Sequence, residues 1–364
     1  MHRALLRHTL ILAVVSIASS VSAFWTENDN NTNNQPQQWS SYFQQRQAGA
    51  CGTGEPSPAL RDAHKRLSST EYRQVVVGDG DSSSNASSRP PVDSLPRIQV
   101  DTWFHVVSTS DQADLVTNAM IADQFVYLQQ AYANTSIHYT LRGVDRSIND
   151  TWARNGDALA MKRTLRRGSY SALNIYFQTN LEMSDPSGVN SRNAMNHNRN
   201  AVTKFPRDQE PHYSSSSASS SAPNLLGFCT LPNPQINSSS TLDDYISDGC
   251  NILAATMPGG SITHYNRGGT AVHEVGHWHG LLHTFQDETC APGDEGDYIP
   301  DTPQQSTPTD GCPAPGTKDS CPDLPGLDAI SNFMDYSSDD CYQNFTYDQA
   351  MRMRSMWSAM REGK

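Results

Sequence analysis

The chain has 364 residues, a formal net charge of −12 and a hydrophobic content of 36%. Its length allows one large domain or two modest ones with a sizeable core. The excess of negative charge argues against nucleic acid or an anionic membrane as the main partner. Two polar tracts account for much of the low hydrophobic content, an Asn/Gln-rich stretch at 28–47 and a serine run at 214–221. Such tracts bury too little apolar surface to offset their ordering entropy, which predicts loops or disorder.

The N-terminus has the layout of a secretory signal. Arg3 and Arg7 precede an apolar run at 10–17, and Val-Ser-Ala at 21–23 offers small residues for cleavage. The run is too short to span a bilayer, so we predict a signal peptide over 1–23 and an extracellular protein. A single N-terminal anchor helix is the alternative, and no later stretch is apolar enough to cross a membrane.

Six Asn-x-Ser/Thr sequons follow the predicted signal. They predict a glycoprotein if the host glycosylates secreted proteins. Their asparagines are Asn30, Asn85, Asn134, Asn149, Asn237 and Asn344.

The segment 24–91 has few apolar residues and no sustained period, apart from a candidate helix at 57–67. We interpret it as a pro-segment with a linker. The remaining residues, 92–364, are predicted to form one catalytic domain.

Strand and helix patterns alternate after residue 92. Alternating apolar residues predict a strand at 98–107, and Ile121, Phe125, Leu128 and Tyr132 have the spacing of an amphipathic helix. Further patterns predict strands at 137–141, 173–178 and 250–255 and a short helix at 158–165. This order predicts an α/β (α+β) fold with a twisted mixed sheet covered by helices. The Pro-, Gly- and Asp-rich stretch 287–331 can be ordered only by disulfides, ions or both.

Residues 273–283 read His-Glu-Val-Gly-His-Trp-His-Gly-Leu-Leu-His. His273 and His277 differ by only ~40° on a helix at ~100° per residue, so both imidazoles can reach one ion. His283 would lie roughly 80° off that face in an unbroken helix. Gly280 can take a positive φ and bend the chain, which would return His283 to the other two. Three histidines leave a fourth position open for water, as in a catalytic zinc site.

Glu274 follows the first predicted ligand and is placed to take a proton from water at the open position. Zinc lowers the pKa of such water from 15.7 toward about 7, so a carboxylate suffices as general base and can return the proton to a leaving amine. Two surface histidines on a helix are the alternative for the short motif, and Gly280 with His283 makes that alternative much less probable than a site. His279, at ~240° from His273, falls on the far face as a bystander.

The long histidine motif together with Asn-Phe-Met-Asp-Tyr at 332–336 resembles the metzincin metallopeptidases, and within them the pappalysin group of fungal-type and ulilysin-like secreted enzymes. The sequence shares three further short motifs with that group: His-Thr-Phe at 283–285, Asp-Thr-Pro at 301–303 and Gly-Leu-Asp at 326–328. The similarity extends over about 98–364 and is dense only after Cys250. It implies a zincin-like fold, peptide-bond hydrolysis and polypeptide substrates; we expect a monomer.

The resemblance also implies residue roles. Met334 would lie in the turn beneath the histidines, and Tyr336 would hydrogen-bond the developing oxyanion. Relatives bind calcium after the zinc helix, and Asp294, Asp297 and Thr302 offer hard oxygen ligands here. A solvated acidic loop is the equally weighted alternative.

The seven cysteines leave at least one outside internal bridges. By similarity, Cys290 pairs with Cys321 and Cys312 pairs with Cys341, which would staple a loop-rich C-terminal subdomain. Cys229 and Cys250 remain as a third pair. Cys51 is left over in the predicted pro-segment. Its thiolate would hold the enzyme latent by occupying the open zinc position, and a free or intermolecularly paired thiol is the alternative.

Substrate preference and rival functions complete the expectations. In ulilysin-like relatives an acidic residue before the last cysteine lies in the pocket for the side chain after the cut. Asp340 takes that place here and predicts cleavage before Arg or Lys.

Two other functions are possible from the sequence, a zinc hydrolase of non-protein amides and an inactive zinc-containing binding protein. An edge strand at 250–257 that pairs with extended substrate would favour a peptidase.

Overall fold

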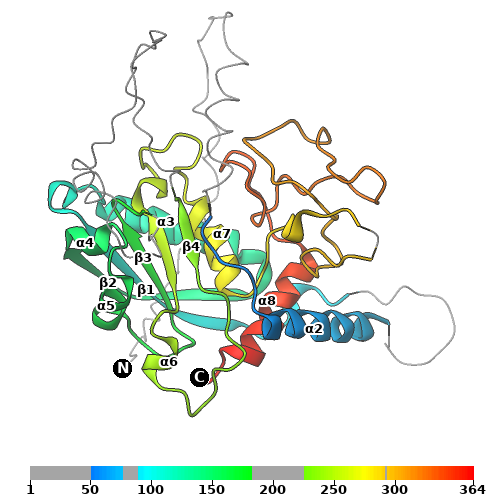
Figure 1. The fold of residues 1–364 in the computed structure, drawn as a ribbon, viewed down its shortest axis with the longest axis horizontal. Helices are drawn as coiled ribbons and strands as arrows, with labels where there is room; N and C mark the ends of the chain where they lie inside the picture. Colours follow the sequence, from blue (N-terminus) through cyan, green and yellow to red (C-terminus); the bar gives the residue numbers. More distant parts are fainter. Residues whose placement is uncertain (1–50, 77–88, 183–224, 292) are drawn as a thin grey trace, which may run out of the picture.

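The computed structural model describes residues 51–76, 89–182, 225–291 and 293–364 (Figure 1). The predicted signal at 1–23, the polar tract at 28–47, the serine run and the sequons at Asn30 and Asn85 lie outside these residues. Of the remaining sequon asparagines, Asn134, Asn237 and Asn344 are exposed and Asn149 is half-buried. None of the described helices is both long and apolar enough to cross a bilayer.

The centre of the molecule is a five-stranded mixed sheet in the order β2-β1-β3-β5-β4. The neighbours run parallel except β4 and β5, which are antiparallel. The strands are β1 (Ile98–Ser108), β2 (Ile137–Ile148), β3 (Leu173–Gln178), β4 (Gly227–Cys229) and β5 (Cys250–Leu253). The predicted α/β fold with a mixed sheet is confirmed.

The edge strand differs from the prediction. β5 pairs with β3 on one side and β4 on the other, so the segment at 250–257 is internal and β4 forms the edge. Every residue of β5 is buried, as expected for a strand with two neighbours. The predicted strand is also too long, because the chain turns into a 3₁₀ helix at Ala254–Thr256.

Helices cover the sheet and join its strands (Figure 1). The helices are α2 (Pro58–Val76), α3 (Asn118–Ala131), α4 (Asp150–Ala153), α5 (Ala158–Leu165), α6 (Leu242–Tyr245), α7 (Gly269–Trp278) and α8 (Tyr347–Met360). Side chains cap several N-termini: Thr117 accepts from the backbone N–H of Met120, and Asp157 accepts from that of Ala160. These contacts satisfy donors that a helix cannot pair within itself.

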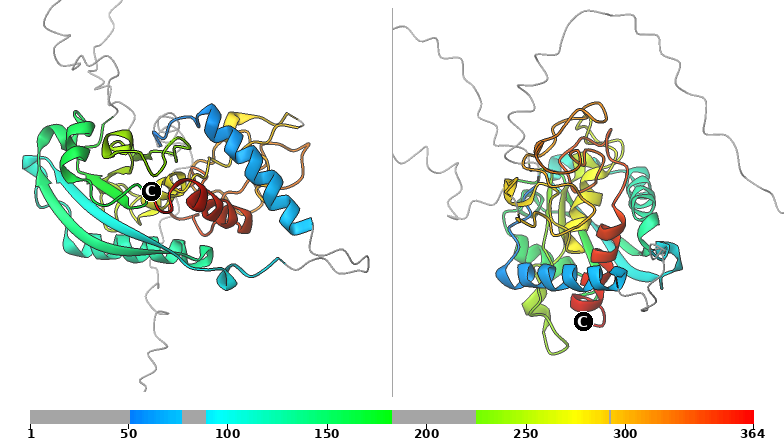
Figure 2. Two further views of the ribbon diagram at one scale, coloured as in Figure 1. Left: turned by 90° about the horizontal axis from the view of Figure 1, so that it is seen from below. Right: turned by 90° about the vertical axis from the view of Figure 1, so that its right-hand side faces the viewer.

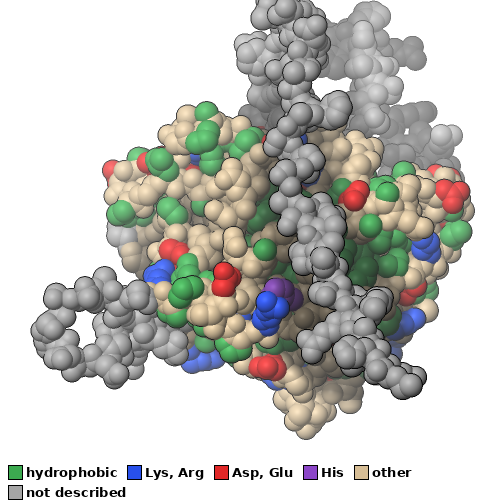
Figure 3. Space-filling model, turned by 180° about the vertical axis from the view of Figure 1, so that it is seen from behind, with side chains coloured by type: hydrophobic (Ala, Val, Ile, Leu, Met, Phe, Trp, Pro, Cys, Tyr) green, Lys and Arg blue, Asp and Glu red, His purple; other side chains and the backbone are tan. Residues whose placement is uncertain are grey.

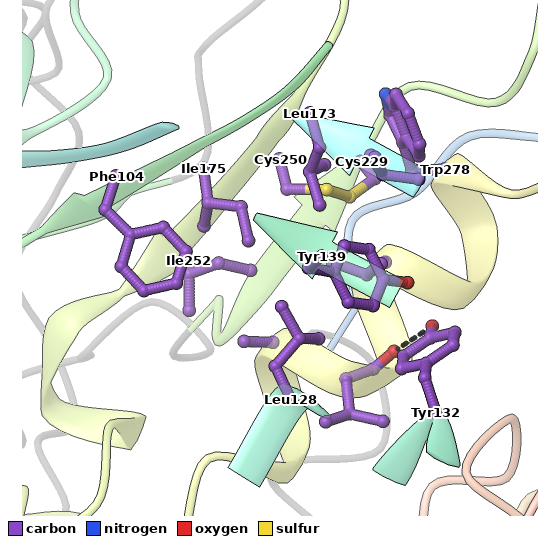
Figure 4. Close-up of a cluster of buried hydrophobic side chains, with 14 of the residues drawn as sticks. Phe104, Leu128, Tyr132, Tyr139, Leu173, Ile175, Cys229, Cys250, Ile252 and Trp278 are labelled. Carbon is purple, nitrogen blue, oxygen red and sulfur yellow. Dashed lines mark hydrogen bonds between the residues drawn. A yellow bond between two sulfur atoms is a disulfide. The ribbon is translucent and has the colours of Figure 1, made fainter. Parts of the chain in front are cut away.

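The main core lies between the sheet and α7. Phe104, Ile175 and Ile252 of the sheet meet Leu128 of α3 and side chains of α7 (Figure 4). The hydroxyl of Tyr132, the residue directly after α3, donates to the Val272 carbonyl at 3.0 Å, which ties the end of α3 to α7. The most buried side chains of the fold thus surround the helix that carries the histidine motif.

The N-terminal helix α2 is longer than the 57–67 predicted, because apolar periodicity stops before the helix does. It crosses α8 in the right-hand view of Figure 2. Leu60 and Ala63 of α2 are buried against Met356 and Met360 of α8. Helix α2 is therefore packed on the domain.

Between α7 and α8 the chain has little regular structure, as predicted for 287–331. The structure contains the three disulfides that we predicted, Cys229–Cys250, Cys290–Cys321 and Cys312–Cys341. The first joins β4 to β5 and is visible in Figure 4. Acidic and basic side chains are dispersed over the face shown in Figure 3 and form no single-charge patch there.

Candidate metal and active site

Helix α7 presents His273 and His277 one turn apart, and both side chains are buried. The helix ends at Trp278, and Gly280 has φ +95°, the bend that the sequence predicted. His283 then returns to the other two histidines. Its Nε2 lies 3.1 Å from Nε2 of His277, which in turn lies 3.1 Å from Nε2 of His273.

The backbone orients two of these rings. Nδ1 of His273 lies 2.7 Å from the Phe333 carbonyl, and Nδ1 of His277 lies 2.8 Å from the Leu281 carbonyl. A carbonyl can only accept, so Nδ1 carries the proton and the Nε2 lone pair faces the shared point. Burial lowers the pKa of His273 to about 4 and that of His277 well below its ordinary value. Neutral imidazole is the form that binds a metal.

A fourth donor comes from the N-terminal segment. Sγ of Cys51 lies 3.6 Å from Nε2 of His277, and the ligand atoms of Cys51, His273, His277 and His283 all lie within 4.8 Å of one another. Among the residues that the structure describes, this is the one group of three or more His, Cys, Asp or Glu that could hold an ion. Three imidazoles and one sulfur fit zinc, which takes four such ligands in a tetrahedron. Burial raises the pKa of the free thiol, and a zinc ion would favour its thiolate.

Glu274 lies beside the histidines and is 1% exposed. Its Oε2 accepts a hydrogen bond of 2.8 Å from the Thr53 hydroxyl, and its Oε1 is buried without a partner. Burial raises the pKa of this carboxyl to about 7. A Cβ at Gly227 would lie 3.0 Å from Cγ of Glu274, so the glycine lets the edge strand β4 approach the carboxylate closely.

The chain at 333–336 lies directly beneath and beside the histidines. Met334 is fully buried, and its sulfur lies where a Cβ at Gly276 would clash, so a glycine is required at that point of α7. The Tyr336 ring lies 4.9 Å from the His283 ring and 5.7 Å from the His273 ring, measured between centroids. Tyr336 and His283 also line a cavity of about 210 Å³ that opens beside them. Burial raises the pKa of the Tyr336 phenol, which keeps it a neutral donor.

Comparison with known proteins agrees with this arrangement. A family model described as Pregnancy-associated plasma protein-A, the peptidase M43 family, matches residues 255–358. An extracellular metalloprotease of Aspergillus fumigatus is 55% identical over 314 residues, which cover 86% of this chain and 89% of that protein. The chain belongs to the pappalysin family of zinc metallopeptidases. An extracellular metalloprotease of Aspergillus oryzae is 52% identical over 325 residues, which cover 88% of this pappalysin and 93% of that relative.

Solved structures agree in fold. Mature mirolysin of Tannerella forsythia, in complex with a cleaved peptide, has a TM-score of 0.51 and 23% identity over 72% of this chain and 92% of its own. A promirolysin mutant of Tannerella forsythia has a TM-score of 0.53 and 22% identity over 85% of this chain and 93% of its own. The pappalysin therefore has the mirolysin-like metzincin fold.

The acidic residues expected to bind calcium are only partly brought together. The Thr302 hydroxyl lies 2.9 Å from both carboxylate oxygens of Asp297. Burial raises the pKa of the Asp297 carboxyl to about 7. Asp294 is exposed and takes no part in this contact.

Asp340 lies at the surface of the pappalysin in contact with two basic side chains. Its Oδ2 lies 2.7 Å from Nδ1 of His264, and its Oδ1 lies 2.5 Å from the Arg267 guanidinium.

Sequence reasoning missed the preceding residue, Asp339, whose side chain is buried and 4% exposed. Oδ2 of Asp339 accepts from the backbone N–H of Arg267, whereas its Oδ1 is buried without a partner. Burial raises the pKa of the Asp339 carboxyl to about 6. The sequence Asp-Asp at 339–340 does not by itself indicate which of the two carboxylates is buried.

The C-terminal end of α7 rests on a buried ion cluster that the sequence did not predict. Both carboxylate oxygens of Asp248 accept from the Arg361 guanidinium, at 3.0 and 3.1 Å, and Arg166 lies 3.4 Å away. The Trp278 indole N–H of α7 also donates to Asp248, and Arg361 stacks 3.7 Å over that ring. Arg361 Nε donates to the Trp278 carbonyl, so the cluster fixes the C-terminal end of α7.

His279 lies on the far side of α7 from His273 and His277, as predicted. Its Nε2 lies 3.0 Å from the Tyr139 hydroxyl of β2, and the ring is 1% exposed. Burial lowers the pKa of His279 to about 3. Its contacts join α7 to the sheet and do not reach the other histidines.

Proposed function

We propose that this pappalysin is secreted and cleaves polypeptides internally, with zinc held by His273, His277 and His283. The observation that carries this proposal is the convergence of three neutral Nε2 atoms beside a buried carboxylate. Zinc, when bound, supplies Lewis-acid activation of water and of the substrate carbonyl.

The chain's own groups perform the proton transfers. Glu274 takes the proton of the attacking water and passes it to the leaving amine, which suits a carboxyl in an apolar setting. Tyr336 donates its phenolic hydrogen to the oxyanion that develops on the carbonyl oxygen. Met334 forms the apolar floor that holds the imidazoles in place.

The edge strand β4 supports a polypeptide substrate rather than a small amide or a purely binding role. Gly227 already pairs with an extended segment, because the backbone N–H of Gly52 donates to its carbonyl at 2.8 Å. A substrate strand can add to the same edge by main-chain hydrogen bonds. This edge lies next to the carboxylate of Glu274. A purely structural zinc site would have no need of that carboxylate.

Cleavage of denatured casein tests the proposal. Matured protein should cut casein, should lose nearly all activity when a chelator removes zinc, and should recover when zinc is restored. Fully matured, zinc-loaded protein that leaves casein intact would favour a non-protein substrate or a binding role. Sites mapped by mass spectrometry would also show whether cleavage is internal.

The N-terminal part is assigned to maturation. We assign 1–23 to a signal peptide, 24–91 to a pro-segment and 92–364 to the catalytic domain, which acts as a monomer. Cys51 occupies the fourth zinc position and holds the enzyme latent, as its distance to His277 supports. Asp297 with Thr302 is the better supported part of a calcium site, since both already face each other.

Docking of α2 is expected to weaken in acid because of His64. This residue is fully buried, accepts from the Arg352 guanidinium at 2.7 Å through Nδ1, and stacks on Tyr298. Burial, with the nearby charges of Arg352 and Arg61, lowers its pKa from 6.5 to about 3. The docked form needs neutral His64, so its contribution is full above pH 6.5 and is lost as the pH falls toward 3. At pH 5 the loss is about 2 kcal/mol relative to pH 7.5.

Hydrogen exchange of α2 at pH 5 and pH 7.5, corrected for intrinsic rates, measures this loss. His64→Gln is the matched control, because its amide oxygen can accept from Arg352 and does not titrate. An equal pH dependence in both proteins would show that His64 is not the titrating group.

Asp340→Ala is expected to lower the preference for Arg or Lys after the cut about tenfold or more, since a charge-assisted hydrogen bond is lost. Peptide libraries digested by matured protein would measure the ratio of basic to apolar residues at that position. Asp339→Asn is the informative partner, because its buried Oδ1 lacks a hydrogen bond. A preference that survives Asp340→Ala and disappears in Asp339→Asn would assign the pocket to Asp339 instead.

A further inference from the structure

The Thr53 hydroxyl makes two hydrogen bonds at the active site. It lies 2.8 Å from Oε2 of Glu274 and 2.9 Å from the backbone nitrogen of Cys229. The Cys229 N–H can only donate, so the Thr53 oxygen accepts from it. The hydroxyl hydrogen is therefore directed to Glu274, and the direction of both bonds is fixed.

These two bonds match those expected in a productive complex. Water poised for attack donates a hydrogen bond to the general base, and here the Thr53 hydroxyl donates it. An added substrate strand accepts from the N–H groups of the edge strand, and here the Thr53 oxygen accepts from β4. Thr53 thus makes the hydrogen bond to the general base that the attacking water would make, and it also takes the place of one substrate acceptor.

The surrounding contacts hold Thr53 in this position. The preceding residue pairs with the edge strand, since the Gly52 N–H donates to the Gly227 carbonyl at 2.8 Å. The Thr53 N–H lies 3.4 Å from Sγ of Cys51, which links the hydroxyl to the thiol two residues earlier. After Thr53, Glu55 contacts Arg61 of α2 and Gln286 of the domain.

We propose that Thr53 is a second latch, which engages the general base while Cys51 engages the metal position. This inference rests on the proposed latency of the chain. Cys51 alone would leave Glu274 free to polarise any water that entered. Thr53 closes that route and adds hydrogen bonds that must break before the segment can leave the cleft.

The test measures how often the latch opens in the zinc-loaded full chain. A thiol reagent in excess can modify Cys51 only when the segment lifts from the histidines, so the initial modification rate reports opening. Thr53→Val keeps the shape and removes both hydrogen bonds, and we expect it to raise that rate about tenfold or more. Thr53→Ser keeps the hydroxyl and should stay within about threefold of the wild type.

A double-mutant cycle separates the proposed role from a merely structural one. In a Glu274→Ala background, which also prevents self-cleavage, Thr53→Val should raise the rate much less than in the wild type. Equal effects in both backgrounds, or equal rates for Thr53→Val and the wild type, would overturn the proposal. Thermal unfolding of each variant identifies loss of the fold, and Thr53→Ala repeats the cycle if the valine variant fails to fold.

Two further measurements keep this inference distinct from the proposed function. If matured protein does not cut casein, the peptidase proposal fails, while the opening rates still report on Thr53. If the full-length Cys51→Ser chain stays latent and adding Thr53→Val releases its activity, Thr53 acts without the thiol. Activity released in full by Cys51→Ser alone would contradict a second latch.

Discussion

Replacing Glu274 by Gln is expected to lower kcat/KM of the matured enzyme by about 10²–10⁴-fold, the usual contribution of a general base. The amide fills the same space but cannot take a proton from water at neutral pH. The zinc content should stay at the wild-type value, because backbone carbonyls and not this side chain orient the rings of His273 and His277. Steady-state kinetics on a fluorogenic peptide and metal analysis of the same sample measure both quantities.

The wild type and the variant should both be matured by the same added protease, so that maturation does not depend on the activity of either protein. Glu288→Gln is the matched control, since this exposed carboxylate lines the same cavity without contacting the histidines. It should keep nearly full activity. A Glu274→Gln enzyme with the wild-type kcat/KM would show that another group is the general base. A variant that contains no zinc would show that the loss of activity reflects lost metal binding and not a lost base.

Replacing Asp248 by Asn is expected to destabilise the fold by about 3–5 kcal/mol, because it leaves two arginines buried without their carboxylate. Arg166 and Arg361 are both buried, and the Asp248 side chain is 3% exposed. The nearby arginines hold the pKa of the Asp248 carboxyl below its ordinary range, although burial alone would raise it. Urea unfolding at pH 7 would show the loss as a lower midpoint with an unchanged slope.

Asp243→Asn provides the comparison within the same region. Asp243 pairs with Arg163 at 2.9 Å, but its side chain is 70% exposed, so the loss of this pair should be far smaller. Equal midpoints for the two variants would show that the buried cluster contributes no more than a surface pair. A lower slope for Asp248→Asn would indicate a change in compactness instead of a change in stability.

The site was predictable wherever the chemistry is local in sequence. His273 and His277 share a helix face by spacing alone, and Gly280 supplies the bend that His283 requires. The cysteine pairs followed from the family resemblance, and the structure contains the same pairs. Helix α5 and strand β3 also lie at the predicted residues, because each has a clear period bounded by polar residues.

The elements that were missed depend on contacts between distant residues. Strand β4 has only three residues, Gly-Phe-Cys, which is too few to show alternation. The partner of Thr53 lies 221 residues away, and the partner of Asp248 lies 113 residues away. No local sequence pattern indicates such pairs. The hydrogen bond of Thr53 to Glu274 and the ion cluster around Asp248 are therefore seen only in the folded structure.

The disulfide between Cys229 and Cys250 has a consequence for how the cleft selects its substrates. A three-residue edge strand held only by hydrogen bonds could shift its register when another strand joins it. The covalent bond to β5 fixes β4 in place, so the cleft behaves as a rigid template. A polypeptide must therefore adopt the extended shape of that template, and unfolded or loop segments can do so far more readily than helices. If the proposed function holds, the disulfide therefore favours unfolded or loop segments over compact, folded proteins as substrates.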